Sequence, residues 1–380
     1  MRRASDADRA RLNDTFAALC RIESPSGRER ACADRVSEEL RALGLAVEED
    51  SAGIAIGSDA GNLLTRLPGS RPQSILLCAH LDTVPPLAPI DPVIVDGGWE
   101  NAGDGILGAD NKAAVAVLLE LARRFADGGE PPPLGLELLF TVAEETGLCG
   151  AKEFDTSRLG SEFGYVFDHA SPIGGIVLAA PTYDRIVAVF HGRAAHAGIR
   201  PEEGRNAIAA AARAIAAMRL GRLDDETTAN VGTIAGGTGT NVVPERCRLQ
   251  AEVRGLDDAR VEQVVTEMVD HLTDAANEAE CDLDVTVERL FGGYRSRPGA
   301  PQIVAATRAL QACGYEPHHL VTGGGSDANA FQKAGLPCAN LADGTEHNHE
   351  PGERISVDAL ESMLEVAIAL LDAAAEVVSA

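Results

Sequence analysis

The stretch Leu76–Pro86 reads LLCAHLDTVPP, and its apolar run stops at His80 and leads to Asp82. A short, nearly continuous apolar run that ends in polar residues is typical of a strand buried in a parallel sheet. Burying a histidine and a carboxylate costs free energy unless the two groups hold something. Residues i and i+2 of an extended chain point the same way. His80 and Asp82 are therefore predicted to lie side by side beyond the carboxyl end of the strand, where open α/β sheets bind ligands.

This pair has two interpretations. In the first, His80 binds a metal ion, and Asp82 holds the other ring nitrogen of the histidine. In the second, His80 is a buried histidine whose hydrogen-bonding needs are met by the nearby acid. The segment by itself favours neither interpretation, so the other strand ends of the same sheet must separate them.

Around this strand, apolar strands alternate with stretches of helical periodicity, which predicts an α/β fold: a mostly parallel sheet with helices on both faces. Helices are predicted over 6–22, 28–44 and 110–129, and strands over 62–69, 74–80, 131–143 and 164–170. From about Thr182 the order becomes β-α-β-β-α-β, which is typical of a ferredoxin-like domain. Helix–strand alternation returns after Gly293. We therefore expect a smaller α+β domain over 181–293, inserted into a larger domain over 1–180 and 294–380.

The composition argues against several classes of protein. The 380 residues carry a formal net charge of −25 with a sequence pI of about 4.7, which argues against a nucleic-acid partner because phosphate binding needs a basic face. No apolar window reaches the length of a membrane span, and the charged start of the chain lacks the apolar core of a signal peptide. We therefore expect no membrane partner and a cytoplasmic location. The 8 cysteines include no C-x-x-C pair, so reduced, mostly buried thiols are expected.

Other ends of predicted elements carry acids, and the late chain carries two histidines. These groups are Asp110, Glu144, Glu145, Asp168, His347 and His349. Each has an ordinary explanation when taken alone, as a helix cap, a solvated loop or a turn residue. The carboxyl ends of parallel strands meet at one edge, however, so the groups are expected to gather in one crevice, where carboxylates repel one another. Divalent cations remove that penalty, and mixed imidazole and carboxylate donors suit zinc, with manganese or cobalt as alternatives.

The chain resembles the M20 metallopeptidases, the family of aminoacylase-1 and peptidase T. The motifs that carry the resemblance are HLDTVPP, GADNKAAVAVLLE, AEETGLCGA, FDHA and HEPGERI, in this order. The resemblance covers nearly the whole chain, including the inserted domain. Together with GGGSDAN, the motifs look nearest to the peptidase T-like branch.

The resemblance implies two metal ions that share one carboxylate. The ligand set that it implies has Asp110 as the bridge, His80 and Asp168 in one site, and Glu145 and His349 in the other. Each ion would then have three protein ligands and an open position, as catalytic zinc requires. The frame HEPGERI, in which a histidine stands a few residues before an acid, favours His349 over His347.

The resemblance also implies catalytic and substrate-binding residues. Glu144 would take the proton of a water shared by the two ions and pass it to the leaving amine, while Asp82 orients His80. In this family the inserted domain pairs across a homodimer and acts as a lid. His196 would thereby reach the partner's active site and polarise the scissile carbonyl. Asn241 and Arg254 resemble a pair that grips a substrate carboxylate.

Three residues near these motifs have weaker interpretations. The stretch TGGGSDANAF lacks the spacings of phosphate-binding loops, and its glycines are interpreted as letting the backbone approach the site. Ser326 and Asp327 within it stay unassigned. Lys112 is expected on a helix surface, although it lies inside a motif.

The predicted function is hydrolysis of peptide bonds in short peptides by a cytoplasmic two-metal aminopeptidase, with tripeptides or dipeptides as substrates. An N-acyl-amino-acid deacylase, acting on acylated amino acids, or a carboxypeptidase of the same family would use the same metal chemistry, so the motifs leave these alternatives open. A non-catalytic binding protein on the same scaffold is disfavoured, because Glu144 and the complete ligand set are present.

Overall fold

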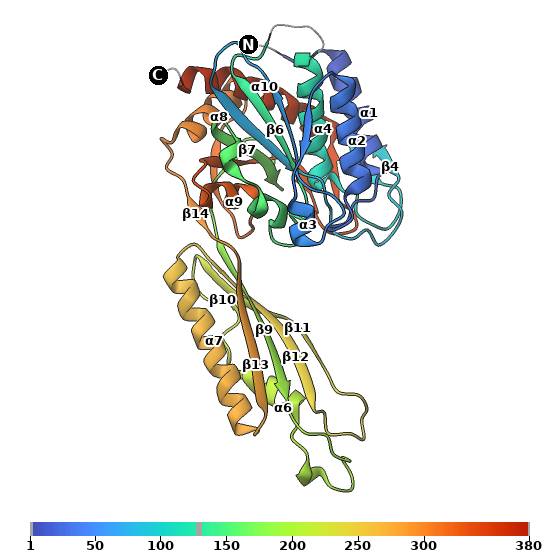
Figure 1. Ribbon diagram of the computed structural model, residues 1–380, viewed down its shortest axis with the longest axis vertical. Coiled ribbons are helices and arrows are strands. Elements are labelled where there is room, and N and C mark those ends of the chain that lie inside the picture. Colours follow the sequence, from blue (N-terminus) through green and yellow to red (C-terminus); the bar gives the residue numbers. More distant parts are fainter. Residues whose placement is uncertain (1–2, 127–130, 379–380) are drawn as a thin grey trace. The chain divides into compact units, whose positions relative to one another are not determined.

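The computed structural model describes residues 3–126 and 131–378, which form two compact units (Figure 1). The first unit contains residues 3–126, 131–179, 296–322 and 326–378, and the second contains residues 180–295 and 323–325. The helix predicted over 110–129 is described up to Ala126, and its remaining predicted residues lie outside the described part of the chain.

Residues 323–325 differ from the prediction, which assigned them to the larger domain. Their contacts explain why they group with the second unit. The carbonyl of Gly323 accepts a hydrogen bond from the Arg254 guanidinium at 3.3 Å. A Cβ on Gly325 would lie 2.3 Å from the ring of Phe291, so only glycine fits there. Gly325 is therefore closely packed within the second unit, and the expectation that these glycines let the backbone approach a site stays a prediction.

The first unit is built on a large mixed sheet whose central strands are parallel. Within this unit the strand order is β1 (Val47–Glu49), β2 (Leu63–Leu67), β6 (Gly135–Thr141), β3 (Ser74–His80), β7 (Ser161–His169), β16 (Cys338–Ala342) and β8 (Gly175–Ala180), with β15 (His318–Val321) paired to β8. The two-residue strand β14 (Tyr294–Arg295) falls among the residues of the second unit. Strands β6, β3, β7 and β16 are parallel neighbours, so their carboxyl ends lie at one edge. The predicted mostly parallel sheet is confirmed.

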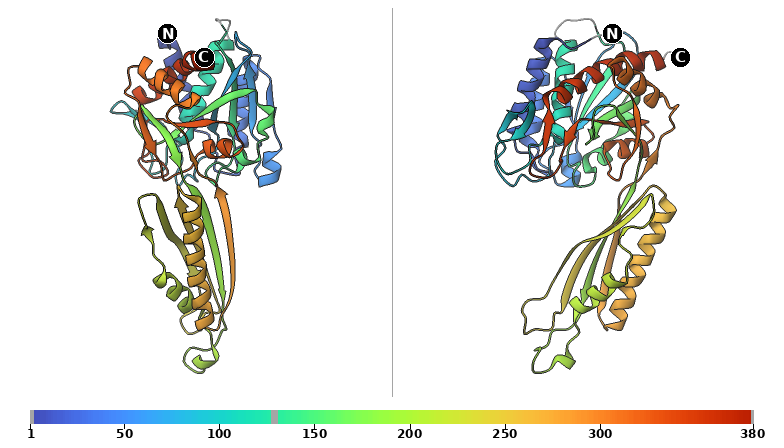
Figure 2. Two further views of the ribbon diagram at one scale, coloured as in Figure 1. Left: turned by 90° about the vertical axis from the view of Figure 1, so that its left-hand side faces the viewer. Right: turned by 180° about the vertical axis from the view of Figure 1, so that it is seen from behind.

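Helices cover both faces of this sheet (Figure 2). On one face, α4 (Ala109–Ala126) packs on β3 and β7 and is surrounded by α1 (Asp6–Cys20), α2 (Arg30–Ala42) and α10 (Val357–Val378), which also contacts α8 (Pro301–Ala312). The other face carries α9 (Asp327–Lys333), with α5 (Cys149–Glu153) beside it and α3 (Ala52–Ile56) against α5. A short 3₁₀ turn, η1 (Thr156–Arg158), precedes β7. Successive side chains of β3 point to opposite faces of the sheet. Leu77 belongs to the core under α4, whereas the Sγ atom of Cys78 lies 3.7 Å from Oδ2 of Asp327 in α9.

Lys112 shows that α4 is buried on more than one side. Its side chain is 1% exposed, and its ammonium donates to the carbonyls of Leu19 and Ile22 at 3.3 and 2.9 Å. The prediction of a surface lysine is wrong. The surrounding helices leave this face of α4 without solvent, and the end of α1 supplies acceptors that a buried ammonium needs.

Among the described residues, no helix combines the length and the apolar character that crossing a bilayer needs.

A smaller sheet in the first unit carries the late histidines. Its strand order is β17 (Thr345–Glu346), β18 (Arg354–Ser356), β5 (Gly98–Asn101) and β4 (Pro92–Val95), all antiparallel. The turn between β17 and β18 holds His347 and His349, both with positive φ. This sheet fixes that turn, because β17 and β18 pair on either side of it.

The second unit is one antiparallel sheet with two α-helices and a short 3₁₀ helix among its described residues. Its strand order is β10 (Gly221–Arg222), β11 (Thr227–Gly236), β12 (Arg246–Gly255), β9 (Thr182–His191) and β13 (Asp282–Phe291), and its helices are α6 (Ala207–Ala217), α7 (Asp258–Glu278) and the short η2 (Pro201–Glu203). Buried and half-buried residues alternate along β9, as expected for a strand with one covered face. Caps at Asn206 and Asp257 start the two long helices. The predicted ferredoxin-like arrangement is confirmed.

Candidate metal centre

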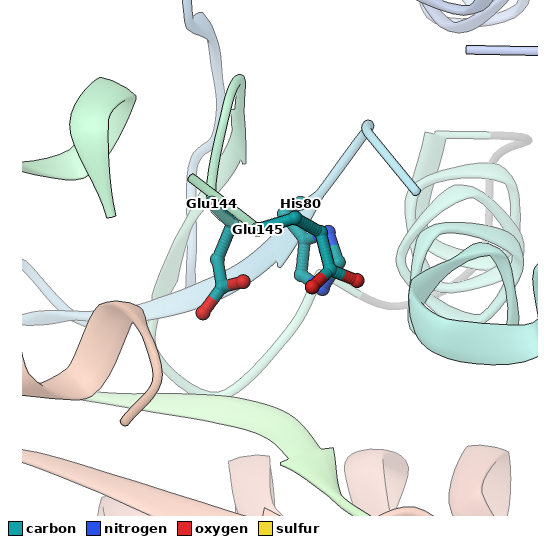
Figure 3. A group of neighbouring side chains, drawn as sticks. All are labelled: His80, Glu144 and Glu145. Carbon is teal, nitrogen blue, oxygen red and sulfur yellow. The ribbon is translucent and has the colours of Figure 1, made fainter. Parts of the chain in front are cut away.

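The predicted metal-binding side chains converge at the carboxyl edge of the main sheet. His80 ends β3, Asp168 lies near the end of β7, and Asp110 lies in the first turn of α4. Glu144 and Glu145 follow β6, and His349 comes from the turn between β17 and β18. Ligand atoms of these residues form three groups, each within 4.8 Å: His80, Asp110 and Asp168; Asp110, Glu145 and His349; and His80, Glu144 and Glu145. Figure 3 shows the third group, with both carboxylates extending to the same side of their loop beside the His80 ring.

Asp110 joins the first two groups because its two oxygens face different histidines. Oδ1 lies 3.1 Å from Nε2 of His80, and Oδ2 lies 3.2 Å from Nε2 of His349. His349 Nε2 is also 2.9 Å from Glu145 Oε1, and His80 Nε2 is 3.8 Å from Asp168 Oδ1. A carboxylate held in this way can donate one oxygen to each of two cations.

The electrostatics of these groups show the cost of gathering carboxylates. Burial, followed by the charge of Asp168, raises the pKa of Glu144 well above its usual range. Burial and the charge of Asp110 do the same to the pKa of Asp168. Burial also acts to raise the pKa of Asp110, but its hydrogen bonds to His349 and His80 hold it below its usual range. Carboxyl groups such as Glu144 and Asp168, which share one buried crevice, therefore tend to keep their protons unless cations take the place of those protons.

Both histidines are drawn toward their charged forms. Hydrogen bonds to Asp110 and Glu145 raise the pKa of His349 to about 10. Burial opposes protonation of His80, but hydrogen bonds led by the one to Asp110 raise its pKa well above the ordinary value. The two groups of three share Asp110 and together contain three carboxylates and two imidazoles. These donors suit zinc and similar metals, so the two groups fit a pair of divalent ions.

The orientation of His80 is set by main chain as well as side chain. Its Nδ1 lies 2.9 Å from the carbonyl oxygen of Asp82 and 3.4 Å from Asp82 Oδ1. A carbonyl only accepts, so Nδ1 carries a proton and donates it. This tautomer points the other nitrogen, Nε2, at Asp110 and Asp168, which is the arrangement a metal ligand needs.

The Asp82 carboxylate has further partners, which the sequence did not indicate. It accepts hydrogen bonds from the main-chain N–H groups of Glu144 at 2.9 Å and Glu145 at 3.1 Å, and from the Ser26 hydroxyl at 2.6 Å. Asp82 therefore positions the loop that bears both glutamates, in addition to lying beside His80.

Other buried side chains hold the same loops and were missed by sequence reasoning. Glu29 accepts the N–H of Ala143 at 3.0 Å, immediately before Glu144. Asn340 exchanges two hydrogen bonds with the main chain of Asp168, at 3.0 and 2.9 Å. Glu29 and Ala143 are 114 residues apart, so no local pattern could have revealed the contact.

The structure separates the two candidate histidines of the late turn. His349 faces Asp110 and Glu145, whereas His347 lies 3.6 Å from Glu350, and its side chain is 64% exposed. His347 instead lines a different cavity, together with residues such as Tyr315. This geometry agrees with the preference for His349 that the HEPGERI frame suggests.

In the second unit, His196 and Asn241 are neighbours. The N–H of Ala197 donates to the Asn241 carbonyl at 2.9 Å, and a β-bridge joins His196 to Val242. Both His196 and Asn241 are exposed.

Arg254 lies apart from them, at the far end of β12. A strand rises about 3.3 Å per residue, so β12 alone separates Asn241 from Arg254 by roughly 25–30 Å. The Arg254 guanidinium packs over the Tyr183 ring at 4.2 Å and pairs with Glu252 at 3.2 Å. The two residues of one chain therefore do not lie side by side, and their joint grip on a substrate carboxylate stays a prediction.

Comparisons with known proteins agree with this fold and site. The model of the peptidase dimerisation domain matches residues 184–280, and that of peptidase family M28 matches residues 62–169. The uncharacterized protein YqjE of Bacillus subtilis is 35% identical over 367 residues, which cover 96% of this chain and 99% of that protein. Two solved structures are also similar over 97% of this chain and 99% of their own. The aminopeptidase PepT of Bacillus cereus has 37% identity and a TM-score of 0.85, and a tripeptidase of Staphylococcus aureus has 33% identity and a TM-score of 0.89.

These similarities extend over nearly the whole chain rather than over one domain. The dimerisation-domain match falls inside the second unit, and the M28 match covers the segment from β2 to β7 that holds His80, Asp110 and both glutamates. The chain therefore belongs to the M20 family of metallopeptidases and is similar to its peptidase T-like members.

Proposed function

We propose that this chain is a two-metal aminopeptidase that removes the N-terminal residue from short peptides, such as tripeptides or dipeptides. The observation that carries the proposal is the position of Asp110, whose two oxygens face His80 and His349 at 3.1 and 3.2 Å. The substrate class is supported by the names of two similar proteins, an aminopeptidase and a tripeptidase.

The residues that would hold the ions are those of the two groups around Asp110. His80 and Asp168 would complete one site, and Glu145 and His349 the other. When bound, a pair of divalent ions, with zinc favoured and manganese or cobalt as alternatives, supplies Lewis acidity and lowers the pKa of water toward neutrality. His80 presents Nε2 in the correct tautomer for this role because Nδ1 donates to the Asp82 carbonyl.

Glu144 is the general base of the proposal. Its carboxylate lies in the group with His80 and Glu145, yet it belongs to neither triad around Asp110, so it is free to move a proton. Burial raises the pKa of Glu144, which makes its ionised form a stronger base. In that form it would accept a proton from the attacking water and later deliver it to the leaving amine. Asp82 and Glu29 hold the loop that positions it.

The second unit would contribute from a second copy of the chain. The match to a peptidase dimerisation domain supports a homodimer formed through this unit. We propose that His196 acts in the partner's active site, where it would donate to the scissile carbonyl oxygen. Asn241, its neighbour, would act beside it, and Arg254 would contact substrate separately, with its fork available for a carboxylate.

The test compares three substrates with enzyme loaded with zinc, manganese or cobalt. The substrates are Ala-Ala-Ala, acetyl-Met and a tripeptide whose amine is blocked, each with and without a chelator. Chelator-sensitive release of the first residue from Ala-Ala-Ala alone supports the aminopeptidase. Turnover of acetyl-Met alone would instead identify a deacylase, and release of the last residue from the blocked peptide would identify a carboxypeptidase.

A further inference from the structure

Glu353 is a buried carboxylate in the segment that also carries His349. It is the last residue of the turn between β17 and β18, directly before Arg354, and it is only 2% exposed. Both of its oxygens accept hydrogen bonds from main-chain N–H groups. Oε2 accepts from Leu107 at 2.9 Å and from Gly108 at 2.8 Å, and Oε1 accepts from Asp110 at 2.9 Å.

The three donors all belong to the short stretch that leads into α4. The first N–H groups of a helix have no partner within the helix, so an acceptor from elsewhere must satisfy them. Here that acceptor is 243 to 246 residues away in sequence. Glu353 therefore ties the backbone of Asp110 to the segment that presents His349.

These hydrogen bonds act on Asp110, the residue that the two candidate metal groups around it share. Asp110 belongs to both triads, and its Oδ2 lies 3.2 Å from His349 Nε2. Three hydrogen bonds, made to the two oxygens of one carboxyl group, restrict both translation and rotation of the backbone that leads to Asp110.

We propose that Glu353 is a positioning residue that fixes the Asp110 carboxylate against His349 and so sets the affinity of the metal pair. The inference rests on the proposed two-metal function. Glu353 touches neither metal-facing oxygen, because its contacts are with main-chain N–H groups. Its effect should therefore appear in metal affinity and not only in stability.

The experiment measures metal binding by chelator-stripped protein in competition with a chromophoric zinc chelator, together with thermal unfolding. In E353Q the side chain keeps its shape, but its amide nitrogen faces N–H donors and leaves at least one of them without an acceptor. We expect E353Q to bind zinc about 10- to 100-fold more weakly, as is usual when a residue that orients a ligand is changed.

A matched control removes another buried carboxylate from the same helix. Glu120 of α4 is 1% exposed and pairs with Arg11 and Arg123, away from the metal groups. E120Q should lower the melting temperature while leaving zinc affinity within about twofold of the wild type. If E120Q weakens zinc binding as much as E353Q does, general destabilisation explains both, and the inference is overturned.

A second variant covers the case in which E353Q does not fold. E353D keeps the charge but is shorter by one methylene, so it cannot reach both Asp110 and Leu107, and an intermediate loss of zinc affinity is expected. Wild-type affinity for two ions in whichever of these variants folds would overturn the inference while leaving the proposed function standing. A wild-type protein that binds fewer than two ions would overturn the proposed function itself, and the inference with it.

Discussion

The edge of the main sheet and the loops of the second unit hold their predicted functional groups in opposite ways. At the sheet edge, His80, Asp110 and Glu144 are buried, and the loops that bear them are fixed by hydrogen bonds from distant residues. In the second unit, His196 and Asn241 are exposed, and it is their main chains, through a β-bridge and a hydrogen bond to Ala197, that hold them together.

The difference between the two regions follows from the free-energy cost of burying charged groups. Buried carboxylates repel one another, so hydrogen bonds are needed to fix the loops at the sheet edge, and binding of cations there is favoured because it cancels the charge. Exposed groups such as His196 and Asn241 carry no such electrostatic cost, so they need no fixed partners within their own chain. Changes at the sheet edge are therefore expected to affect metal content or chemistry, and changes in the second unit to affect turnover alone.

The largest effect is expected from Glu144→Gln. Removing a general base typically costs about 10²- to 10⁴-fold in rate, so kcat for Ala-Ala-Ala should fall by that factor. Metal content should stay the same, because Glu144 belongs to neither triad around Asp110. Steady-state kinetics and metal analysis measure both quantities. Glu153→Gln, at an exposed position of α5, is the control and should be neutral; unchanged kcat in Glu144→Gln would refute the assignment of the base.

The next effect tests the other side of the comparison. His196→Ala should lower kcat/KM by about 10²- to 10³-fold, the usual cost of losing a donor to a developing oxyanion. Its metal content and melting temperature should equal those of the wild type, because the side chain is exposed. His191→Ala, another histidine of the second unit, which pairs with Asp284, serves as the control. A monomer in light scattering with full activity would contradict the proposed role of His196.

The late turn offers a paired test within the first unit. His349→Ala should bind its second ion at least about 100-fold more weakly, since even the loss of an outer partner of a ligand can cost that much. His347→Ala removes a neighbouring, more exposed histidine and should bind both ions normally. Metal stoichiometry measured after dialysis distinguishes the two variants. The reverse pattern would make His347 the ligand.

The smallest effect is a pH dependence of metal binding. The raised pKa of His349, about 10, means that metal-free protein holds a proton there through neutral pH. That proton stabilises the metal-free fold fully below the unfolded-state pKa of about 6.5, and the stabilisation is lost as pH rises toward 10. Ions must displace it, so affinity should rise with pH by at most about tenfold per unit for each proton released.

The check for this prediction is the melting temperature of zinc-loaded and chelator-treated protein at pH 6 and pH 8. The difference between the two forms should be larger at pH 8. In His349→Ala the difference should change less with pH, because one displaced proton is gone. A difference that shrinks as pH rises would contradict the proposed competition between protons and ions.

The sequence by itself determined the elements and the edge at which chemistry gathers. Apolar runs such as the one ending at His80 predicted parallel strands, and periodicity predicted helices such as α1, α4 and α7. The parallel central strands and the β-α-β-β-α-β unit agree with these patterns. The side chains at the strand ends were identifiable because a polar residue directly after a buried strand is visible in the sequence.

Tertiary structure alone decided which distant groups hold that edge together. Lys112 is buried because other helices pack around α4, and Asn241 and Arg254 are apart because β12 is extended between them. Glu29 and Glu353 act across 114 and more than 240 residues. Periodicity reports which side of an element faces the core, but it contains no information on what packs against that side, so these contacts follow only from the folded arrangement.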